Sequence, residues 1–448
     1  MKEYLLLNRD KILFEFSYKF SNKEHIYELG QLYVDPELLP IEFQTYGYSE
    51  QTLAAWVGKR VAPMSRQYME ELLNAVNLQN KFDILLYCYG LSLNDTYWVK
   101  EKSDPITFQD VNLYDNPFDE TLGQIAFTGI SKPIPNKSLT PEFTTDGMLP
   151  KYWQNGIYLT KGGTSDYANA GGEPYSEVIA SLIAKKLNIN AIPYTLDKRD
   201  DKPVSICKLF TSKQYGLLPM NKFLRYKSNG ALMVSLEDAK NAILEELPTL
   251  EPFYDMCFFD WLIKNDDRHL NNWGFLVNNE TRKIESLSPI WDNGMSLLWS
   301  SMEYDFPNAY DYNNYFASFN IPYDFVLECE YRPKYIELCN HLLQYLNSKE
   351  ATADFSNVFG DDTKHNWKTP YIIEMLKRRC NQYISLTREW KKGVMFNSEL
   401  FLKLCMKYNV DITDNSTNLG LFLEMDNGEI TPLTPDLFEF IIGESISY

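Results

Sequence analysis

The sequence predicts an α+β protein of more than one domain, and three observations lead to this prediction. Residues 1–120 mix a strand pattern with a helix pattern, residues 140–215 are rich in strand patterns, and the chain beyond Ser235 is mainly helical. Separate strand-rich and helix-rich segments are typical of the α+β class. The length of 448 residues also exceeds what one hydrophobic core commonly serves.

The N-terminal segment carries two periodicities. Aromatic and aliphatic residues recur at every second position from Ile12 to Phe20, which predicts a half-buried strand. A helix face is predicted by four apolar residues at the spacing i, i+3, i+4, i+7, namely Met69, Leu72, Leu73 and Val76. Residues 131–150 hold four prolines, and we interpret them as a linker or a functional loop.

The next segment is predicted to be a strand-rich lobe with one helix. Strands are predicted at GIYLTKGG, residues 156–163, and at PVSICKLF, residues 203–210. The helix between them ends near Asn188. Its apolar face consists of Val178, Ile179, Leu182 and Ile183. The glycines that precede this helix could contact phosphate or form a flexible connection, and we take the flexible connection as the default for Gly162, Gly163, Gly171 and Gly172.

The remainder of the chain is predicted to be largely helical. Ser235 and Asp238 form a capping-box pattern before two aromatic-rich helical stretches, and strand-like pieces surround VNNETRKI, residues 277–284. After residue 320 the pattern is helical to Trp390. The tail is predicted to begin with a helix at residues 397–409 and to form a hairpin around Asn427-Gly428. The predicted domains are 1–120, 121–225, 226–395 and an acidic extension at 396–448.

Composition and charge exclude several classes of protein. Apolar residues make up 44% and aromatic residues 15%, which argues against a disordered chain. The net charge of −18, from 43 basic and 61 acidic residues, argues against nonspecific binding to nucleic acid or to an anionic membrane. An acidic chain that binds an anionic ligand needs local lysines, helix N-termini or a divalent metal ion.

Cysteine usage and apolar runs predict a reducing, cytoplasmic setting. The seven cysteines are scattered and form no Cys-x-x-Cys pair, which argues against a disulfide framework and a structural zinc site. We expect most of them to be buried small apolar residues. The N-terminal apolar run is too short for a signal peptide, and no stretch approaches 18 uncharged apolar residues.

The most informative stretch is WLIKNDDRHLNNWGFLV, residues 261–277. Asp267 precedes Asn272 by five residues, which is the spacing in kinase catalytic loops, where the Asp accepts the substrate proton and the Asn binds a metal ion. A further acidic residue, Asp292, follows a short apolar run and precedes Asn-Gly, as a metal-binding Asp does in kinases. Two such carboxylates share a site only with a cation between them, and Mg²⁺ suits oxygen ligands.

The strand-rich segment supplies the complementary charge. Lys161 ends the strand GIYLTK, and Glu177 is predicted to lie in the first turn of the following helix. An ion pair between them would place the Lys161 ammonium on the ATP phosphates, as in protein kinases.

Each of these residues also has a simpler interpretation. Asp267 and Arg268 could form a surface ion pair, Asn272 could cap a turn, and Asp292 could be an ordinary loop residue. Likewise Lys161 could be solvated. The order of the whole set along the chain favours the catalytic interpretation.

The motifs TTDGMLPK at 144–151, GIYLTKGG, EPYSEVIASLIAKKLNI, NDDRHLNN and PIWDNG resemble the HipA-type serine/threonine kinases of bacteria over residues 120–390. The resemblance implies a two-lobed protein-kinase-like fold. It implies Asp267, Lys161 and Asn272 as catalytic residues and Asn272 and Asp292 as Mg²⁺ ligands. The implied ATP-binding residues are Thr144, Thr145, Gly147, Lys151, Lys161, Glu177, Cys207, Lys208 and Phe210, the last three in a hinge that receives adenine.

The resemblance also implies ATP- and Mg²⁺-dependent phosphorylation of a protein substrate, without direct binding to nucleic acid. It suggests a toxin of a toxin–antitoxin pair that acts on a translation component, a helix-turn-helix antitoxin as partner, and self-phosphorylation at Thr144 or Thr145. Two alternatives stay open: a small-molecule or lipid kinase, and a nucleotide-binding protein without catalysis. The N-terminal segment matches the family only faintly, and the extension after residue 395 has no counterpart in it.

Overall fold

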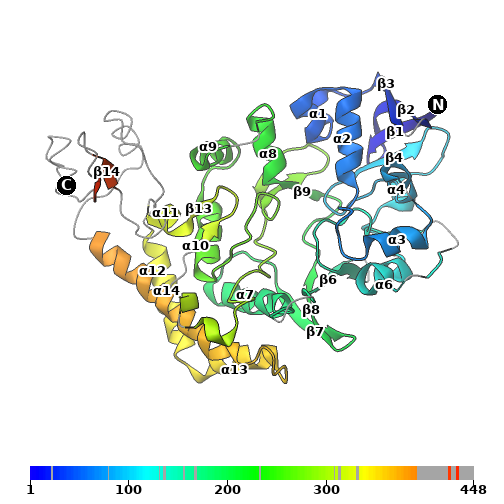
Figure 1. Ribbon diagram of the computed structural model, residues 1–448. Coiled ribbons are helices and arrows are strands. Elements are labelled where there is room, and N and C mark those ends of the chain that lie inside the picture. The colour runs from blue at the N-terminus through cyan, green and yellow to red at the C-terminus, as the bar shows by residue number, and fades with distance from the viewer. Residues whose placement is uncertain are drawn as a thin grey trace, which may run out of the picture.

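The computed structural model describes residues 1–390 apart from 22–23, 79, 131, 135–137, 155–156, 166–168, 232–233, 307, 311–313 and 329–331, together with two short strands near the C-terminus. Figure 1 shows a strand-and-helix N-terminal module on the right, a small sheet with one long helix below it, and a helical lobe on the left. Helices and separate antiparallel sheets confirm the predicted α+β class.

The N-terminal module is an antiparallel sheet covered by short helices. Its sheet has the order β3-β2-β1-β4, with bounds β1 Lys2–Asn8, β2 Lys11–Ser21, β3 Glu24–Leu32 and β4 Tyr97–Glu101. The helices are η1 Pro36–Leu38, α1 Ile41–Tyr46, α2 Glu50–Arg60, α3 Met69–Ala75, α4 Lys81–Tyr87, α5 Phe108–Val111 and α6 Glu120–Thr128. The strand predicted from Ile12 to Phe20 is confirmed as β2, and the helix face from Met69 is confirmed as α3.

The second unit is a four-stranded antiparallel sheet with one long helix against it. The sheet order is β5-β6-β8-β7, with bounds β5 Lys151–Gln154, β6 Tyr158–Gly162, β7 Tyr194–Arg199 and β8 Lys202–Lys208. Helix α7 runs over Glu173–Leu187 and ends on Asn188, whose left-handed backbone closes it as predicted. Strand β7 escaped the sequence analysis.

The helical lobe begins with a second small sheet. Strands β9 Tyr215–Pro219, β10 Gly274–Asn278 and β11 Ile284–Leu287 form it in the order β11-β10-β9, and β12 Tyr315–Phe316 pairs with β13 Ile321–Pro322. The helices are α8 Met220–Lys227, α9 Leu236–Glu246, α10 Glu251–Leu262, η2 Glu303–Asp305, η3 Asn308–Tyr310, α11 Tyr323–Glu328, α12 Pro333–Leu346, α13 Lys349–Phe359 and α14 Lys368–Trp390. The capping box of Ser235 and Asp238 is confirmed at the start of α9.

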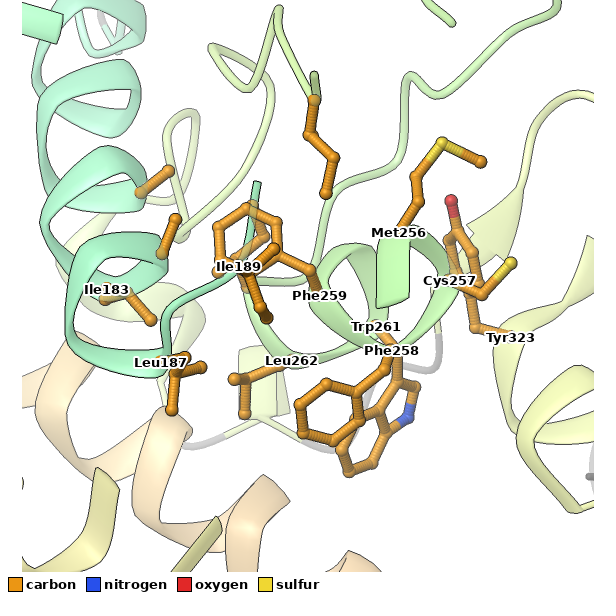
Figure 2. Close-up of a cluster of buried hydrophobic side chains, with 14 of the residues drawn as sticks. Ile183, Leu187, Ile189, Met256, Cys257, Phe258, Phe259, Trp261, Leu262 and Tyr323 are labelled. Carbon is orange, nitrogen blue, oxygen red and sulfur yellow. The ribbon is translucent and has the colours of Figure 1, made fainter. Parts of the chain in front are cut away.

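The second unit and the helical lobe share one hydrophobic core, in which α7 packs on α10. Ile183 and Leu187 of α7 face Phe259 and Leu262 of α10, and all four are buried (Figure 2). Burying such a side chain contributes about 1.5–3 kcal/mol, so this contact fixes α7 relative to the helical lobe. Residues 265–272, here called the catalytic loop after its predicted role, follow α10 and are thereby placed against the helix that carries Glu177.

The predicted hairpin near the C-terminus is confirmed by strands β14 Phe422–Glu424 and β15 Ile430–Pro432, which pair antiparallel. The helix predicted at 397–409 lies outside the described residues. The domain boundaries stay predictions, and two elements lie across them: α6 packs in the core of the N-terminal module, and α8 packs in the core of the helical lobe. Among the described residues, no helix is long and apolar enough to cross a membrane.

The cysteines follow the sequence interpretation where they are described. Five of them are free and buried, namely Cys88, Cys207, Cys257, Cys339 and Cys380. Within the described part of the chain, no group of three or more His, Cys, Asp or Glu residues is arranged to hold a metal ion.

Candidate active site

Lys161 is the centre of the site. Its ammonium lies 2.5 Å from a carboxylate oxygen of Glu177 and forms a second ion pair with Asp292. Strand β6 supplies Lys161, α7 supplies Glu177, and the segment after β11 supplies Asp292, so one cation joins three parts of the chain. The second carboxylate oxygen of Glu177 accepts a hydrogen bond from the backbone N–H of Asn293, 2.8 Å away. The ion pair predicted between Lys161 and Glu177 is therefore present.

The protonation states of Lys161 and Asp292 depend on each other. Burial opposes the charged form of Lys161, but the carboxylates of Asp292 and Glu177 outweigh it and raise the pKa of the ammonium. Burial would raise the pKa of Asp292, but the ammonium of Lys161, aided by Lys151, holds it well below its usual range. Lys161 is therefore protonated and Asp292 ionised at neutral pH. Asp292 also has a left-handed backbone, with φ of 58°, which is uncommon outside glycine.

The catalytic-loop residues Asp267 and Asn272 lie together as the motif predicts. The amide nitrogen of Asn272 donates to the backbone oxygen of Asp267 at 3.0 Å, and the backbone N–H of His269 donates to the same oxygen at 2.8 Å. Burial and then the nearby charge of Asp292 raise the pKa of Asp267, against the opposing effect of His269. A raised pKa brings a carboxylate closer to the range in which it works as a general base.

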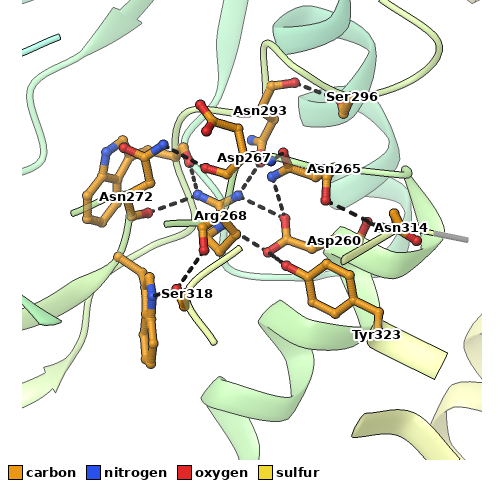
Figure 3. A network of polar contacts seen from close by, with 12 residues as sticks. Asp260, Asn265, Asp267, Arg268, Asn272, Asn293, Ser296, Asn314, Ser318 and Tyr323 are labelled. Carbon is orange, nitrogen blue, oxygen red and sulfur yellow. Dashed lines mark hydrogen bonds and ion pairs between the residues drawn. The ribbon is translucent and has the colours of Figure 1, made fainter. Parts of the chain in front are cut away.

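Arg268 connects the catalytic loop to Asp292. Its guanidinium is fully buried and donates two hydrogen bonds to the Asp260 carboxylate, at 2.8 and 2.9 Å. It donates further to the backbone oxygens of Asn272 and Trp291 and to the side-chain oxygen of Asn293 (Figure 3). These acceptors lie at the end of the catalytic loop and on both sides of Asp292, so one side chain fixes the relative position of the two acidic residues.

The structure excludes one simpler interpretation and corrects two predictions about these elements. Arg268 does not form a surface ion pair with Asp267, because it is buried and paired with Asp260. Glu177 lies in the second turn of α7 rather than the first, because the helix already begins at Glu173 with Pro174 in its first turn.

The glycines before α7 are the second correction, because close packing accounts for two of them. A Cβ on Gly172 would lie 2.4 Å from the backbone oxygen of Trp299, and one on Gly163 would lie 2.9 Å from the Cα of Gly171.

The segment 144–151, here called the phosphate loop, ends beside Lys161. Lys151, at its end, pairs in register with Lys161 across β5 and β6. Its ammonium donates to the backbone oxygen of Asp146 at 2.8 Å. Burial, followed by repulsion from Lys161, lowers the pKa of Lys151 to about 8. Gly147 has φ of 100°, a backbone conformation that favours glycine, and a Cβ there would force the Lys151 ammonium, 2.0 Å away, to move.

Both threonines of the phosphate loop use their hydroxyl groups. The Thr144 hydroxyl donates to the backbone oxygen of Leu91 at 2.8 Å, and the Thr145 hydroxyl donates to the backbone oxygen of Pro141 at 2.8 Å. The indole N–H of Trp153 donates to the Thr145 hydroxyl at 3.0 Å. Hydrogen bonds of its own side chains therefore hold the loop in place.

The predicted hinge lies where β8 loses its strand partners. Cys207 pairs in register with strands on both sides, whereas Lys208 pairs with Tyr158 of β6 alone and Phe210 lies beyond the strand. The Phe210 ring lies 5.2 Å from that of Trp291, centroid to centroid, which brings the hinge next to Asp292. Burial raises the pKa of Cys207 to about 12, so its thiol is neutral.

The donor set fits a magnesium ion with few protein ligands. The amide nitrogen of Asn272 is used in a bond to Asp267, which leaves its oxygen as the ligating atom, and Asp292 is ionised. An amide oxygen and a carboxylate are hard ligands, and Mg²⁺ commonly takes only one or two carboxylates and completes its shell with phosphate and water.

Four residues at the site were missed by the sequence analysis. Asp260 and Asn293 hold Arg268, and Arg66 and Glu142 form a buried ion pair under the phosphate loop at 3.0 Å. Asp260 did carry a signal, because a lone carboxylate within the apolar run MCFFDWL, residues 256–262, must find a partner when buried. The other three carried none.

Comparison with known proteins assigns the part of the chain that holds this geometry. The model of the HipA-like C-terminal domain matches residues 144–342, which contain Lys161, Glu177, Asp267, Asn272 and Asp292. Residues 144–342 belong to the HipA-like C-terminal domain family. The recognised HipA-like resemblance is thereby confirmed, and this HipA-like domain includes the phosphate loop, α7, the catalytic loop and the Asp292 segment.

The chain is similar to a curated relative and to solved structures, among them those of CtkA and HipA. The serine/threonine-protein kinase CtkA of Helicobacter pylori is 32% identical over 133 residues, which is 28% of this chain, and the chain spans 40% of that relative's length. The crystal structure of H. pylori CtkA has a TM-score of 0.39 at 20% identity and covers 54% of this chain and 93% of its own. HipA of Shewanella oneidensis, in complex with HipB and operator DNA, has a TM-score of 0.48 at 11% identity and covers 87% of this chain and all 100% of its own.

Proposed function

We propose that the chain is a protein kinase that transfers the γ-phosphoryl group of ATP to a serine or threonine hydroxyl. The observation that supports this most is the buried Lys161 between Glu177 and Asp292, next to the catalytic-loop residues Asp267 and Asn272. The printed name of the CtkA relative, a serine/threonine-protein kinase, supports the choice of acceptor.

In the proposed mechanism, each residue has a separate task. Asp267 accepts the proton of the acceptor hydroxyl, and its raised pKa suits a general base. The Lys161 ammonium, positioned by Glu177, neutralises charge on the ATP phosphates. Asn272 and Asp292 would hold Mg²⁺, which when bound offsets phosphate charge and orients the phosphoryl group.

In the proposed site, the phosphate loop would cover the ATP phosphates. The loop brings the Lys151 ammonium beside Lys161, and Gly147 lets the backbone come close to a phosphate. A chain with a net charge of −18 thus concentrates two ammonium groups where an anionic ligand is expected.

The test is transfer of label from γ-labelled ATP by the wild-type chain and by the Asp267→Asn and Asp292→Asn variants. We expect labelled phosphoserine or phosphothreonine with the wild type in the presence of Mg²⁺, and a loss of label in both variants. ATP binding without any transfer by the wild type would favour a noncatalytic nucleotide-binding protein. Transfer to a lipid or metabolite instead of protein would favour the small-molecule alternative.

We further propose that the chain phosphorylates itself at Thr144 or Thr145. Both hydroxyls lie in the phosphate loop, and a phosphate on either would break its present bond to the backbone. Intact-mass analysis after incubation with Mg-ATP should show one added phosphate, which the Thr144→Val, Thr145→Val double variant should lack. An unchanged mass of the wild type would contradict this.

The toxin role, a translation component as substrate, a helix-turn-helix antitoxin and a cytoplasmic setting remain proposals from the family resemblance. A small helix-turn-helix gene adjacent to this one would support them. Growth arrest on expression of the wild type, absent with Asp267→Asn, would test the toxin role directly.

A further inference from the structure

One buried side chain of the N-terminal module forms hydrogen bonds at both ends of the phosphate loop. The Arg66 side chain is 1% exposed and follows α2 of that module. Its guanidinium donates to the Glu142 backbone oxygen at 2.5 Å and carboxylate at 3.0 Å, just before the loop. The same guanidinium donates to the backbone oxygen of Lys151 at 2.7 Å, at the end of the loop. Arg66 therefore closes the base of the loop.

Backbone bonds on either side of Arg66 hold the loop as well. The Ala62 N–H donates to the oxygen of Phe143 at 2.6 Å, and the Gln67 N–H donates to that of Met148 at 3.1 Å. The second carboxylate oxygen of Glu142 accepts from the backbone N–H of Trp153 at 2.9 Å, which extends the grip into β5. The start, middle and end of the loop are thus bonded to one segment of the N-terminal module.

The opposite side of the same module is bonded to the helical lobe. The Leu217 N–H in β9 donates to the backbone oxygen of Asn94 at 2.7 Å, and the Asn8 side chain donates to that of Asn279 at 2.7 Å. Glu42 forms an ion pair with Lys222 at 2.8 Å. Asn279 directly follows β10, the strand that begins next to the catalytic loop. The module thus bridges the phosphate loop and the sheet beside the catalytic loop.

We propose that Arg66 is a positioning residue that holds the phosphate loop in its ATP-binding shape before ATP arrives. This inference rests on the proposed kinase function and gives the N-terminal module a role in it. A loop that contains Gly147 with a left-handed backbone has a high entropic cost of ordering. Where the loop is already ordered in the free protein, ATP binding does not bear that cost.

A matched control is available in the same module. Arg60 is also buried and also has one carboxylate partner, Asp95, at 2.6 Å, plus the backbone oxygens of Gly90 and Tyr97. The bonds of its guanidinium are all to residues outside the phosphate loop. Arg66→Lys and Arg60→Lys each keep the charge and remove the planar fork, so they should lower stability similarly.

The experiment combines hydrogen exchange in the nucleotide-free full chain with ATP kinetics. In Arg66→Lys we expect the loop amides to exchange about tenfold faster and the KM for ATP to rise about tenfold, with kcat changed less than about threefold. In Arg60→Lys, loop exchange and the KM for ATP should stay within about twofold of wild type. Equal behaviour of the two variants in exchange and in KM would overturn the proposal, because it would reduce Arg66 to a structural residue.

A second variant keeps the test decisive if Arg66→Lys does not fold. Glu142→Gln retains the shape of the Arg66 partner and removes its charge, and it should reproduce the faster loop exchange and the higher KM. Unchanged exchange and KM in Glu142→Gln would also contradict the proposal. If the wild type neither binds nor uses ATP, the kinase function fails, while the exchange comparison of Arg66→Lys with Arg60→Lys still decides whether Arg66 orders the loop.

Discussion

Replacing Arg268 by methionine should destabilise the protein strongly. It should also remove the contacts that fix Asp267 relative to Asp292. The arginine is fully buried and makes five hydrogen bonds, two of them to Asp260. Removing one partner of a buried ion pair commonly costs about 3–5 kcal/mol, because the other charge is left without compensation. That is a large part of a typical unfolding free energy of about 5–15 kcal/mol.

The structure moderates this value in one respect. Asp260 would keep hydrogen bonds from the amide of Asn265 at 2.8 Å and the hydroxyl of Tyr323 at 3.2 Å. We therefore expect a loss near the lower end, about 3 kcal/mol, with further loss from the unsatisfied backbone oxygens of Asn272 and Trp291.

A double-mutant cycle in chemical denaturation measures the interaction itself. The unfolding free energies of wild type, Asp260→Asn, Arg268→Met and the double variant should show that the double variant loses at least about 2 kcal/mol less than the sum of the single losses. Losses that add within about 0.5 kcal/mol would refute the reasoning, because they would mean that the two side chains are energetically independent.

Three further predictions concern single positions. Because Lys151 has a pKa of about 8 and loses its charge above it, the KM for ATP should rise as the pH passes through about 8, and Lys151→Met should abolish that dependence in steady-state kinetics. Gly172→Ala should lower the unfolding free energy, measured by chemical denaturation, by about 1–3 kcal/mol, since its Cβ would meet a backbone oxygen. Gly58→Ala in α2 is the control: a Cβ there meets nothing within 4 Å, so this variant should raise the unfolding free energy by about 0.5–1 kcal/mol. Lys161→Met should cost about 3–5 kcal/mol at neutral pH by leaving Glu177 and Asp292 unpaired, and the cost should shrink as acid protonates them, which denaturation at several pH values would show.

The site could be predicted from the sequence where its residues lie in short motifs. The spacing of Asp267 and Asn272 and the late Asp292 required no tertiary information, and the pairing of Lys161 with Glu177 followed from a strand leading into a helix. The start of that helix was misplaced because the glycines before it looked like a flexible connection. The close contact at Gly172 is with Trp299, which lies far along the chain.

What the sequence did not show are the partners that hold these motifs in place. Arg66 and Glu142 are 76 residues apart, and a buried ion pair between such distant positions leaves no local pattern. Strand β7 was missed because its residues alternate only weakly between buried and exposed. The N-terminal module therefore appeared unrelated to the site, although in the structure it contacts the phosphate loop directly.

The most direct test of the proposed kinase function is the turnover of Asp267→Asn at saturating Mg-ATP, compared with its affinity for ATP. Loss of a general base should lower kcat by about 10²–10⁴-fold, while ATP affinity stays within about threefold, because Asp267 acts on the acceptor hydroxyl rather than on the nucleotide. Unchanged turnover in Asp267→Asn would contradict the assignment of the catalytic loop and with it the proposed mechanism.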